Sequence, residues 1–254
     1  MILCIVGIVH GYDLLPYYLD HYRKLGVSRF VIACDADALD PTGRLSDHLR
    51  AQPDVVLDAL PKSFRRSQLV GFIEEEMRRK HAGPDDWIIP ADLDELNQYP
   101  SPLPALIAEF ESEGFTHMSG VMRDRISPDG TLAPLLPFDH GVSIWSQYPW
   151  ETDATALVAG GWTDKVLLSK GDVELSAGHH FPRYRESTRP APHTGIAHHF
   201  KWRSELQTML DWRIENEKRA KMPWQKDSIS LARFFKSHDR FDLEGLGATH
   251  GWHP

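Results

Sequence analysis

The sequence has little cysteine, since only Cys4 and Cys34 occur among its 254 residues. Each lies within an apolar run, where a thiol is usually a small buried side chain. This pattern argues against a disulfide framework and favours a reducing cytoplasm. The spacings of zinc sites, such as HExxH or paired CxxC, are also missing, which argues against a zinc protease or a zinc finger.

The chain also lacks long hydrophobic runs, internal repeats and an excess of positive charge. The apolar start at 1–9 is too short to span a bilayer and has no basic segment or cleavage site, so we expect a first core strand. The formal net charge of -8 argues against nucleic acid as the main partner, because phosphate binding needs a basic face. We therefore expect a cytoplasmic protein without a membrane anchor of its own.

What is present indicates an α/β fold. The 41% hydrophobic content over 254 residues is enough for one large domain with a helical appendage. Apolar runs predict buried strands at 2–9, 29–34, 55–57 and 87–89, and a hairpin of strands at 165–169 and 173–175. The segment 13–25 has helical spacing, with Asp13 as its expected N-cap and Tyr18 and Tyr22 among its periodic apolar positions. Strands joined by a helix form right-handed units, so we expect a mostly parallel central sheet flanked by helices. We predict a catalytic domain at 1–203 and a C-terminal helical extension at 204–254 packed on it.

Three carboxylates follow the apolar run at 87–89, namely Asp92, Asp94 and Glu95. We expect extended backbone there, so that Asp92 and Asp94 point the same way while Leu93 lies in the core. Two close carboxylates repel unless a cation sits between them or one is protonated. Such oxygen ligands suit Mg²⁺ or Mn²⁺. The alternative, turn residues or helix caps, stays open because Asp-x-Asp also occurs at 35–37.

Other polar residues are expected near the same edge. His10 and Asp35 follow the first two strands, and ligands of open α/β sheets bind beyond the carboxyl ends of such strands. Arg65 and Arg66 begin a predicted helix at 64–80, where the helix dipole favours acidic residues. That placement indicates a nearby anion or, equally, a surface ion pair.

The last third of the chain is rich in histidine and tryptophan. One of five histidines at 179, 180, 193, 198 and 199 could complete an ion site begun by the aspartates. The tryptophans at 145, 150 and 162 indicate either a stacking platform for sugar rings or closure of the core. The basic, aromatic tail at 218–236 predicts contact with an anionic membrane surface at the inner face of the membrane, coverage of a partner, or simple packing on its own domain.

Several of these motifs together resemble the glycosyltransferase family 2-like enzymes of the GT-A fold, over the span from the first strand to about residue 203. The segment 15–27 is similar to the family pattern L-x-x-W/Y-L-x-H-x-x-x-L-G-V, and 87–96 resembles W-x-x-x-x-D-x-D-E-F with leucine in place of phenylalanine. Asp35, Asp40 and Thr42 match polar positions of a second motif, in which Ala36 and Ala38 replace asparagine and serine. The segments 165–166, 178–180 and 198–203 resemble the C-terminal signature. The dipeptide at 11–12 departs from the Asn-Glu that is common in related enzymes.

The resemblance implies transfer of a sugar from a UDP- or GDP-linked nucleoside diphosphate donor to a hydroxyl of a saccharide or lipid-linked acceptor, with Mn²⁺ or Mg²⁺. It implies that Asp35 binds the nucleoside, that Asp92 contacts the ribose or the metal, and that Asp94 ligates the metal. His199, or else His198, is the expected further ligand.

The same resemblance extends to the phosphates and to the catalytic base. Arg65 or Arg66 is expected at the phosphates and His10 at the nucleotide-sugar edge. An inverting member also needs a carboxylate base, for which Glu151, Asp153 and Asp164 are candidates. Glu95 is expected to cap or brace the metal loop.

Three functional hypotheses remain at this point. The first is a metal-dependent, inverting glycosyltransferase for cell-surface or capsular polysaccharide. The second is a metal-dependent phosphoester or sugar-nucleotide hydrolase that uses the same aspartates and histidines to activate water. The third is a non-catalytic binding module, which the adjacent charges at 92–95 disfavour because a structural strand end does not need them.

Overall fold

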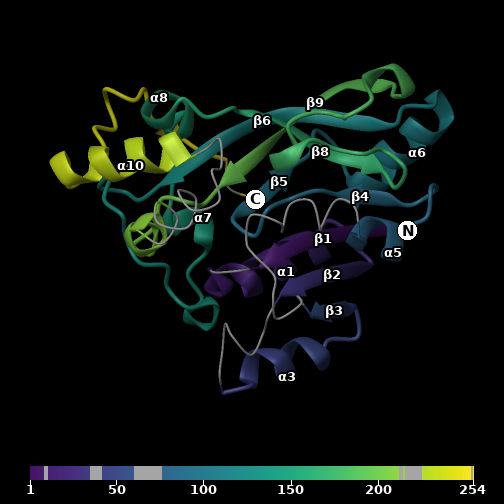
Figure 1. Ribbon diagram of the computed structural model, residues 1–254, viewed down its shortest axis with the longest axis horizontal. Helices are drawn as coiled ribbons and strands as arrows, with labels where there is room; N and C mark the ends of the chain where they lie inside the picture. The colour runs from purple at the N-terminus through teal and green to yellow at the C-terminus, as the bar shows by residue number, and fades with distance from the viewer. Residues whose placement is uncertain (9–10, 35–41, 60–75, 212–213, 215–224, 253) are drawn as a thin grey trace. The chain divides into compact units, whose positions relative to one another are not determined.

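The computed structural model describes residues 1–8, 11–34, 42–59, 76–211, 214, 225–252 and 254 (Figure 1). They form two compact units, the first made of residues 1–121 and 164–197 and the second of residues 122–163 and 198–254. The α/β class predicted from the sequence is confirmed, since helices alternate with strands of a mixed sheet. Each unit has its own hydrophobic core.

Four parallel strands form the centre of the first unit (Figure 1), in the order β4-β1-β2-β3. Their bounds are β1 Ile2–Ile8, β2 Arg29–Cys34, β3 Val55–Ala59 and β4 Trp87–Ile89. This is the mostly parallel, Rossmann-like sheet that the apolar runs predict. The antiparallel neighbour of β4 is β8 (Asp164–Lys170), in which Lys170 pairs with Trp87.

The remaining elements of the first unit range from three to eleven residues in length. The helices are η1 Tyr12–Leu14, α1 Leu15–Lys24, α3 Arg44–Arg50, α5 Arg78–His81, α6 Leu103–Glu113, η5 Ala177–His179 and η6 Arg185–Ser187. Strand β5 (Glu95–Gln98) pairs with β9 (Pro190–His199), and β6 (His117–Ile126) pairs with β8. One buried cluster packs Met77, the residue before α5, against the parallel strands, and consists of Leu3, Ile5, Val31, Ala33, Met77 and Ile88.

Two local predictions in this unit are wrong. Asp13 does not cap the first helix, because the chain enters η1 through Gly11 in a left-handed conformation with φ 68°, where glycine has no steric penalty. The strand expected at 173–175 is not formed beyond a single bridge from Leu175 to Pro182. Its backbone is engaged elsewhere, because the Arg78 guanidinium donates to the carbonyls of Gly171 and Val173.

The second unit combines the end of β6 with β7 (Trp150–Thr152) and β10 (Thr249–His250), all antiparallel. Its helices are η4 Phe138–His140, α7 Ile144–Gln147, α8 Ala154–Ala159 and α10 Gln225–Ser237, and residues 206–211 are also helical. Leu231 and Phe241 of the tail pack on Trp202 and Leu206 in its core. Among the described residues, no helix is both long enough and apolar enough to cross a membrane. Membrane contact by the tail stays a prediction.

Candidate functional site

The Asp-x-Asp segment lies at a special point of the first unit. Strand β1 pairs with β2 on one side and with β4 on the other, so the strand order reverses between β1 and β4. In open α/β sheets, ligands bind beyond the carboxyl ends of the strands at such a switch point. Residues 90–95 follow directly after β4 and therefore lie where this topology places a ligand.

The backbone of this segment forms a turn. The amide of Glu95 donates to the carbonyl of Asp92 at 2.9 Å, and the amide of Asp92 donates to the Glu95 carboxylate at 3.4 Å. The extended backbone expected for Asp92–Asp94 is therefore wrong. Leu93 is buried as expected, Asp94 is half-buried, and the Asp92 side chain is 57% exposed. Of the two aspartates, Asp92 thus faces solvent, while the buried Glu95 holds the turn through its hydrogen bonds to the Asp92 backbone.

Helix α1 holds the backbone of this turn and of β5 through three polar side chains on one face. The hydroxyl of Tyr18 donates to the Ala91 carbonyl at 3.1 Å. The hydroxyl of Tyr22 donates to the Glu95 carbonyl at 3.0 Å and accepts the Asn97 amide at 3.1 Å. Residues three and four apart share a helix face, so the spacing of these side chains suits one contact surface.

His21 completes that face. Its Nε2 lies 2.9 Å from the Asn97 carbonyl, which can only accept, so Nε2 carries the proton. Burial lowers the pKa of His21 to about 4, against which the Asn97 carbonyl acts only in part. The ring is therefore neutral at pH 7 and acts as a hydrogen-bond donor that fixes the start of β5.

Lys165 on β8 supplies a buried positive charge beside the turn. Its ammonium lies 2.6 Å from Glu95 Oε1 and 3.6 Å from Asp92 Oδ2, and it donates to the Gly178 carbonyl at 2.9 Å. Burial by itself would lower the pKa of Lys165, but Glu95 and Asp92 outweigh it and raise the pKa above its usual value. Lys165 therefore stays charged. Lys165 was not named as a site residue from the sequence. Its signal is its position directly before the apolar run at 166–168, where a buried lysine needs an acidic partner.

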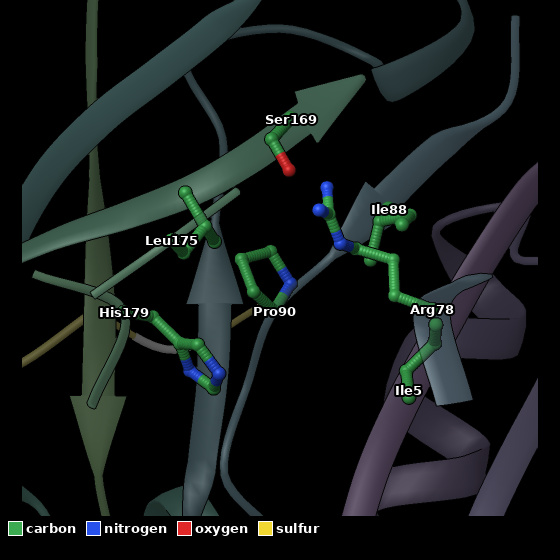
Figure 2. Close-up of a pocket in the computed structure, with 7 residues that line it drawn as sticks. All are labelled: Ile5, Arg78, Ile88, Pro90, Ser169, Leu175 and His179. Carbon is green, nitrogen blue, oxygen red and sulfur yellow. The ribbon is translucent and has the colours of Figure 1, made fainter. Parts of the chain in front are cut away.

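The loop at 176–180 lies next to Lys165. His180 Nδ1 donates to the Asp164 carbonyl at 2.7 Å, and burial, more than any nearby charge, lowers the pKa of His180. His179 is buried at φ 59°. It lines a small cavity together with Ile5, Arg78, Ile88, Pro90, Ser169 and Leu175 (Figure 2).

That cavity is too small for a substrate. Its volume is about 10 Å³, which is roughly the space of one water molecule. The Ser169 hydroxyl is buried and has no hydrogen-bond partner in the described part of the chain. The cavity is therefore not a candidate substrate site.

The second unit contains a buried carboxylate–histidine pair. His199 Nδ1 donates to Asp124 Oδ1 at 2.8 Å, and the Thr155 hydroxyl donates to the same oxygen at 2.7 Å. Asp124 is 1% exposed. Burial would raise the pKa of Asp124, but His199 and Thr155 together lower it. Asp124 was missed from the sequence, where its only signal is a charge at an inward position of β6.

Two of the candidate bases in the second unit are paired with arginines. Glu151 Oε1 accepts from the fully buried Arg125 at 2.8 Å and from the Trp252 amide at 3.0 Å. His198 Nδ1 lies 3.4 Å from the same Glu151 oxygen. Asp153 pairs with Arg123. In the first unit, the third candidate, Asp164, is an exposed residue at the start of β8.

The predicted site residues are thus distributed as follows. Asp92, Asp94 and Asp164 belong to the first unit, and His198, His199, Glu151 and Asp153 belong to the second. His10, Asp35, Arg65 and Arg66 lie outside the described residues. The catalytic, nucleotide-binding and metal-binding roles of all these residues stay predictions.

The donor set at the turn fits a hard divalent ion. Within the described residues, no group of three or more His, Cys, Asp or Glu side chains could hold a metal. Asp92 and Asp94 nevertheless supply carboxylate oxygens, and Asp92 is open to solvent. Mg²⁺ and Mn²⁺ commonly use one or two carboxylates and take their other ligands from water and substrate phosphates.

No protein-family model and no curated protein matches the chain. Among solved structures, it is similar to a 4-diphosphocytidyl-2C-methyl-D-erythritol synthase, with 13% identity, a TM-score of 0.38, and coverage of 91% of this chain and 98% of that one. A UDP-glucose pyrophosphorylase complexed with UDP-glucose gives 10% identity and a TM-score of 0.30, covering 100% and 91%. The Francisella tularensis 2-C-methyl-D-erythritol 4-phosphate cytidylyltransferase gives 10% identity and a TM-score of 0.26, covering 97% of each chain. These scores are too low to support an activity.

Proposed function

We propose that the chain is a glycosyltransferase that moves a sugar from a UDP- or GDP-linked donor to a hydroxyl of a saccharide or lipid-linked acceptor. The observation that carries this proposal is the position of Asp92 and Asp94, directly beyond β4 at the switch point of the parallel strands. Helix α1 and Lys165 both hold this turn, and its Asp92 carboxylate is exposed. This combination supports binding of a ligand in one orientation. Inversion at the sugar and a role in polysaccharide synthesis belong to the same proposal.

Asp92 and Asp94 would hold Mn²⁺ or Mg²⁺, which when bound would neutralise the charge of the departing diphosphate. Of the two histidines that the sequence resemblance implies as metal ligands, the contacts within the second unit favour His199 over His198. Asp124 accepts the Nδ1 proton of His199, so the lone pair of the neutral ring lies on Nε2. This carboxylate–histidine arrangement is typical of histidines that bind metals through the other nitrogen.

Of the three candidate bases, the contacts favour Asp164. Glu151 accepts hydrogen bonds from a buried arginine and from a backbone amide, and Asp153 is paired with Arg123. Both carboxylates are therefore less available to take a proton. Asp164 is exposed and directly precedes Lys165 in the first unit, the unit that contains the Asp-x-Asp turn. An acceptor hydroxyl would lose its proton to Asp164 as the sugar is transferred.

A thermal-shift screen with UDP and GDP, with and without Mn²⁺, tests the binding part of this proposal. A ligand that binds only the folded state raises the melting temperature. We expect a Mn²⁺-dependent shift that Asp94→Ala abolishes and that Asp85→Ala retains, because Asp85 is exposed and precedes β4 at its other end. An unchanged shift in Asp94→Ala would remove Asp94 from the metal site.

Turnover separates transfer from hydrolysis. The proposed enzyme consumes the donor sugar only when an acceptor sugar is added. Equal loss of the donor without acceptor would favour a sugar-nucleotide hydrolase that uses the same aspartates. Nucleotide binding without turnover under any acceptor would indicate a binding module.

A further inference from the structure

Glu95 and Lys165 form a buried ion pair directly under the Asp-x-Asp turn. The Glu95 residue is 2% exposed and Lys165 is 3% exposed, with their charged atoms 2.6 Å apart. A buried carboxylate is costly unless an opposite charge and hydrogen bonds compensate it. Lys165 supplies such a charge for Glu95.

The ammonium of Lys165 also reaches two other segments. It donates to the Gly178 carbonyl at 2.9 Å and lies 3.6 Å from Asp92 Oδ2. The ammonium is thus hydrogen-bonded to Gly178 and Glu95 and lies at ion-pair distance from Asp92. Because Lys165 is buried, it can affect a bound substrate only indirectly, through the residues that it contacts.

Asp92 is therefore fixed at several points. Its amide and its carbonyl are both hydrogen-bonded to Glu95. One carboxylate oxygen faces Lys165, while the side chain as a whole remains 57% exposed. The turn thus has a defined geometry set by protein groups alone.

We infer that Lys165 is a positioning residue, which through Glu95 and Asp92 presets the Asp-x-Asp turn for the diphosphate end of a nucleotide sugar. The identity of that ligand rests on the proposed function above, whereas the ordering of the turn does not. The competing explanation is that Lys165 only neutralises Glu95 and has no effect on Asp92.

Two variants separate these explanations. Lys165→Met leaves the Glu95 charge buried without its partner, so it lowers stability under either explanation. The double variant Lys165→Met with Glu95→Gln removes both charges and keeps an oxygen that can accept the Asp92 amide. Lys170→Met is the matched control, because Lys170 lies on the same strand and pairs with the partly exposed Glu111 at 3.1 Å.

Hydrogen–deuterium exchange of the ligand-free protein measures how well the turn is ordered, and calorimetry measures the affinity for UDP or GDP with Mn²⁺. We expect the double variant to melt near the wild-type temperature, yet to exchange its amides at 92–97 about tenfold faster and to bind nucleotide about tenfold more weakly. Lys170→Met should change neither readout. Wild-type exchange and affinity in the double variant would overturn the inference. If the wild-type protein binds neither nucleotide, the proposed function fails, and exchange at 92–97 alone still decides the role of Lys165.

Discussion

Tyr22→Phe tests whether helix α1 holds the Asp-x-Asp turn by hydrogen bonds and not by packing alone. The substitution keeps the buried ring and its edge contact with Tyr18, whose centroid lies 4.7 Å away. It removes one hydroxyl that donates to the Glu95 carbonyl at 3.0 Å and accepts the Asn97 amide at 3.1 Å. Both backbone groups are then left without this partner in a buried region.

The magnitude follows from those two groups. A buried polar group that loses its partner costs about 1–3 kcal/mol. With two groups affected, we expect the free energy of unfolding to fall by about 2–6 kcal/mol. Tyr18→Phe removes a single backbone contact, to the Ala91 carbonyl at 3.1 Å, and should cost less.

Urea unfolding of the wild type and the variants measures this difference. Tyr184→Phe is the control, because Tyr184 is 53% exposed and a surface change of this kind usually stays within about 0.5 kcal/mol. A loss of that small size in Tyr22→Phe would refute the reasoning. The helix would then hold the turn by packing, and the hydroxyl would have no role in its position.

Two further predictions concern the buried histidines. Burial lowers the pKa of His21 from 6.5 to about 4, so the unfolded chain binds more protons; the free energy of unfolding should fall by up to about 3 kcal/mol as the pH drops from about 6.5 to 4. His21→Gln should flatten this part of the pH profile in urea unfolding, and an unchanged slope would contradict it. Asp124→Asn removes the carboxylate that accepts from His199 and Thr155, so we expect a loss of about 1–3 kcal/mol in stability. ¹⁵N NMR should then show that the Nδ1 proton of the neutral His199 ring is no longer preferred, and the wild-type tautomer in this variant would count against the assignment.

The parallel strands could be predicted from sequence because each is a short apolar run with a clear boundary. Strands β2 and β4 were predicted with the bounds that the structure has. The turn at 92–95 could not be predicted, since Glu95 bends it by bonding to both backbone groups of Asp92. In an extended strand, side chains two residues apart point the same way. That rule fails where a local hydrogen bond, such as those between Glu95 and Asp92, turns the backbone.

Helix α1 illustrates the same limit. Its spacing predicted that Tyr18 and Tyr22 face inward, and both are fully buried. Spacing does not tell which backbone groups their hydroxyls meet, because the partners of these two tyrosines lie 73 residues along the chain. The strand expected at 173–175 failed for a similar reason, as Arg78 takes carbonyls that a sheet would need.

Charged residues at buried strand positions carry information that periodicity overlooks. Lys165 and Asp124 both occupy buried positions in strands, at 3% and 1% exposure. A charge in such a position needs a partner, and each of these two holds a residue that the sequence had already marked, Asp92 for Lys165 and His199 for Asp124. Each unit therefore fixes one candidate functional group through a buried charged residue.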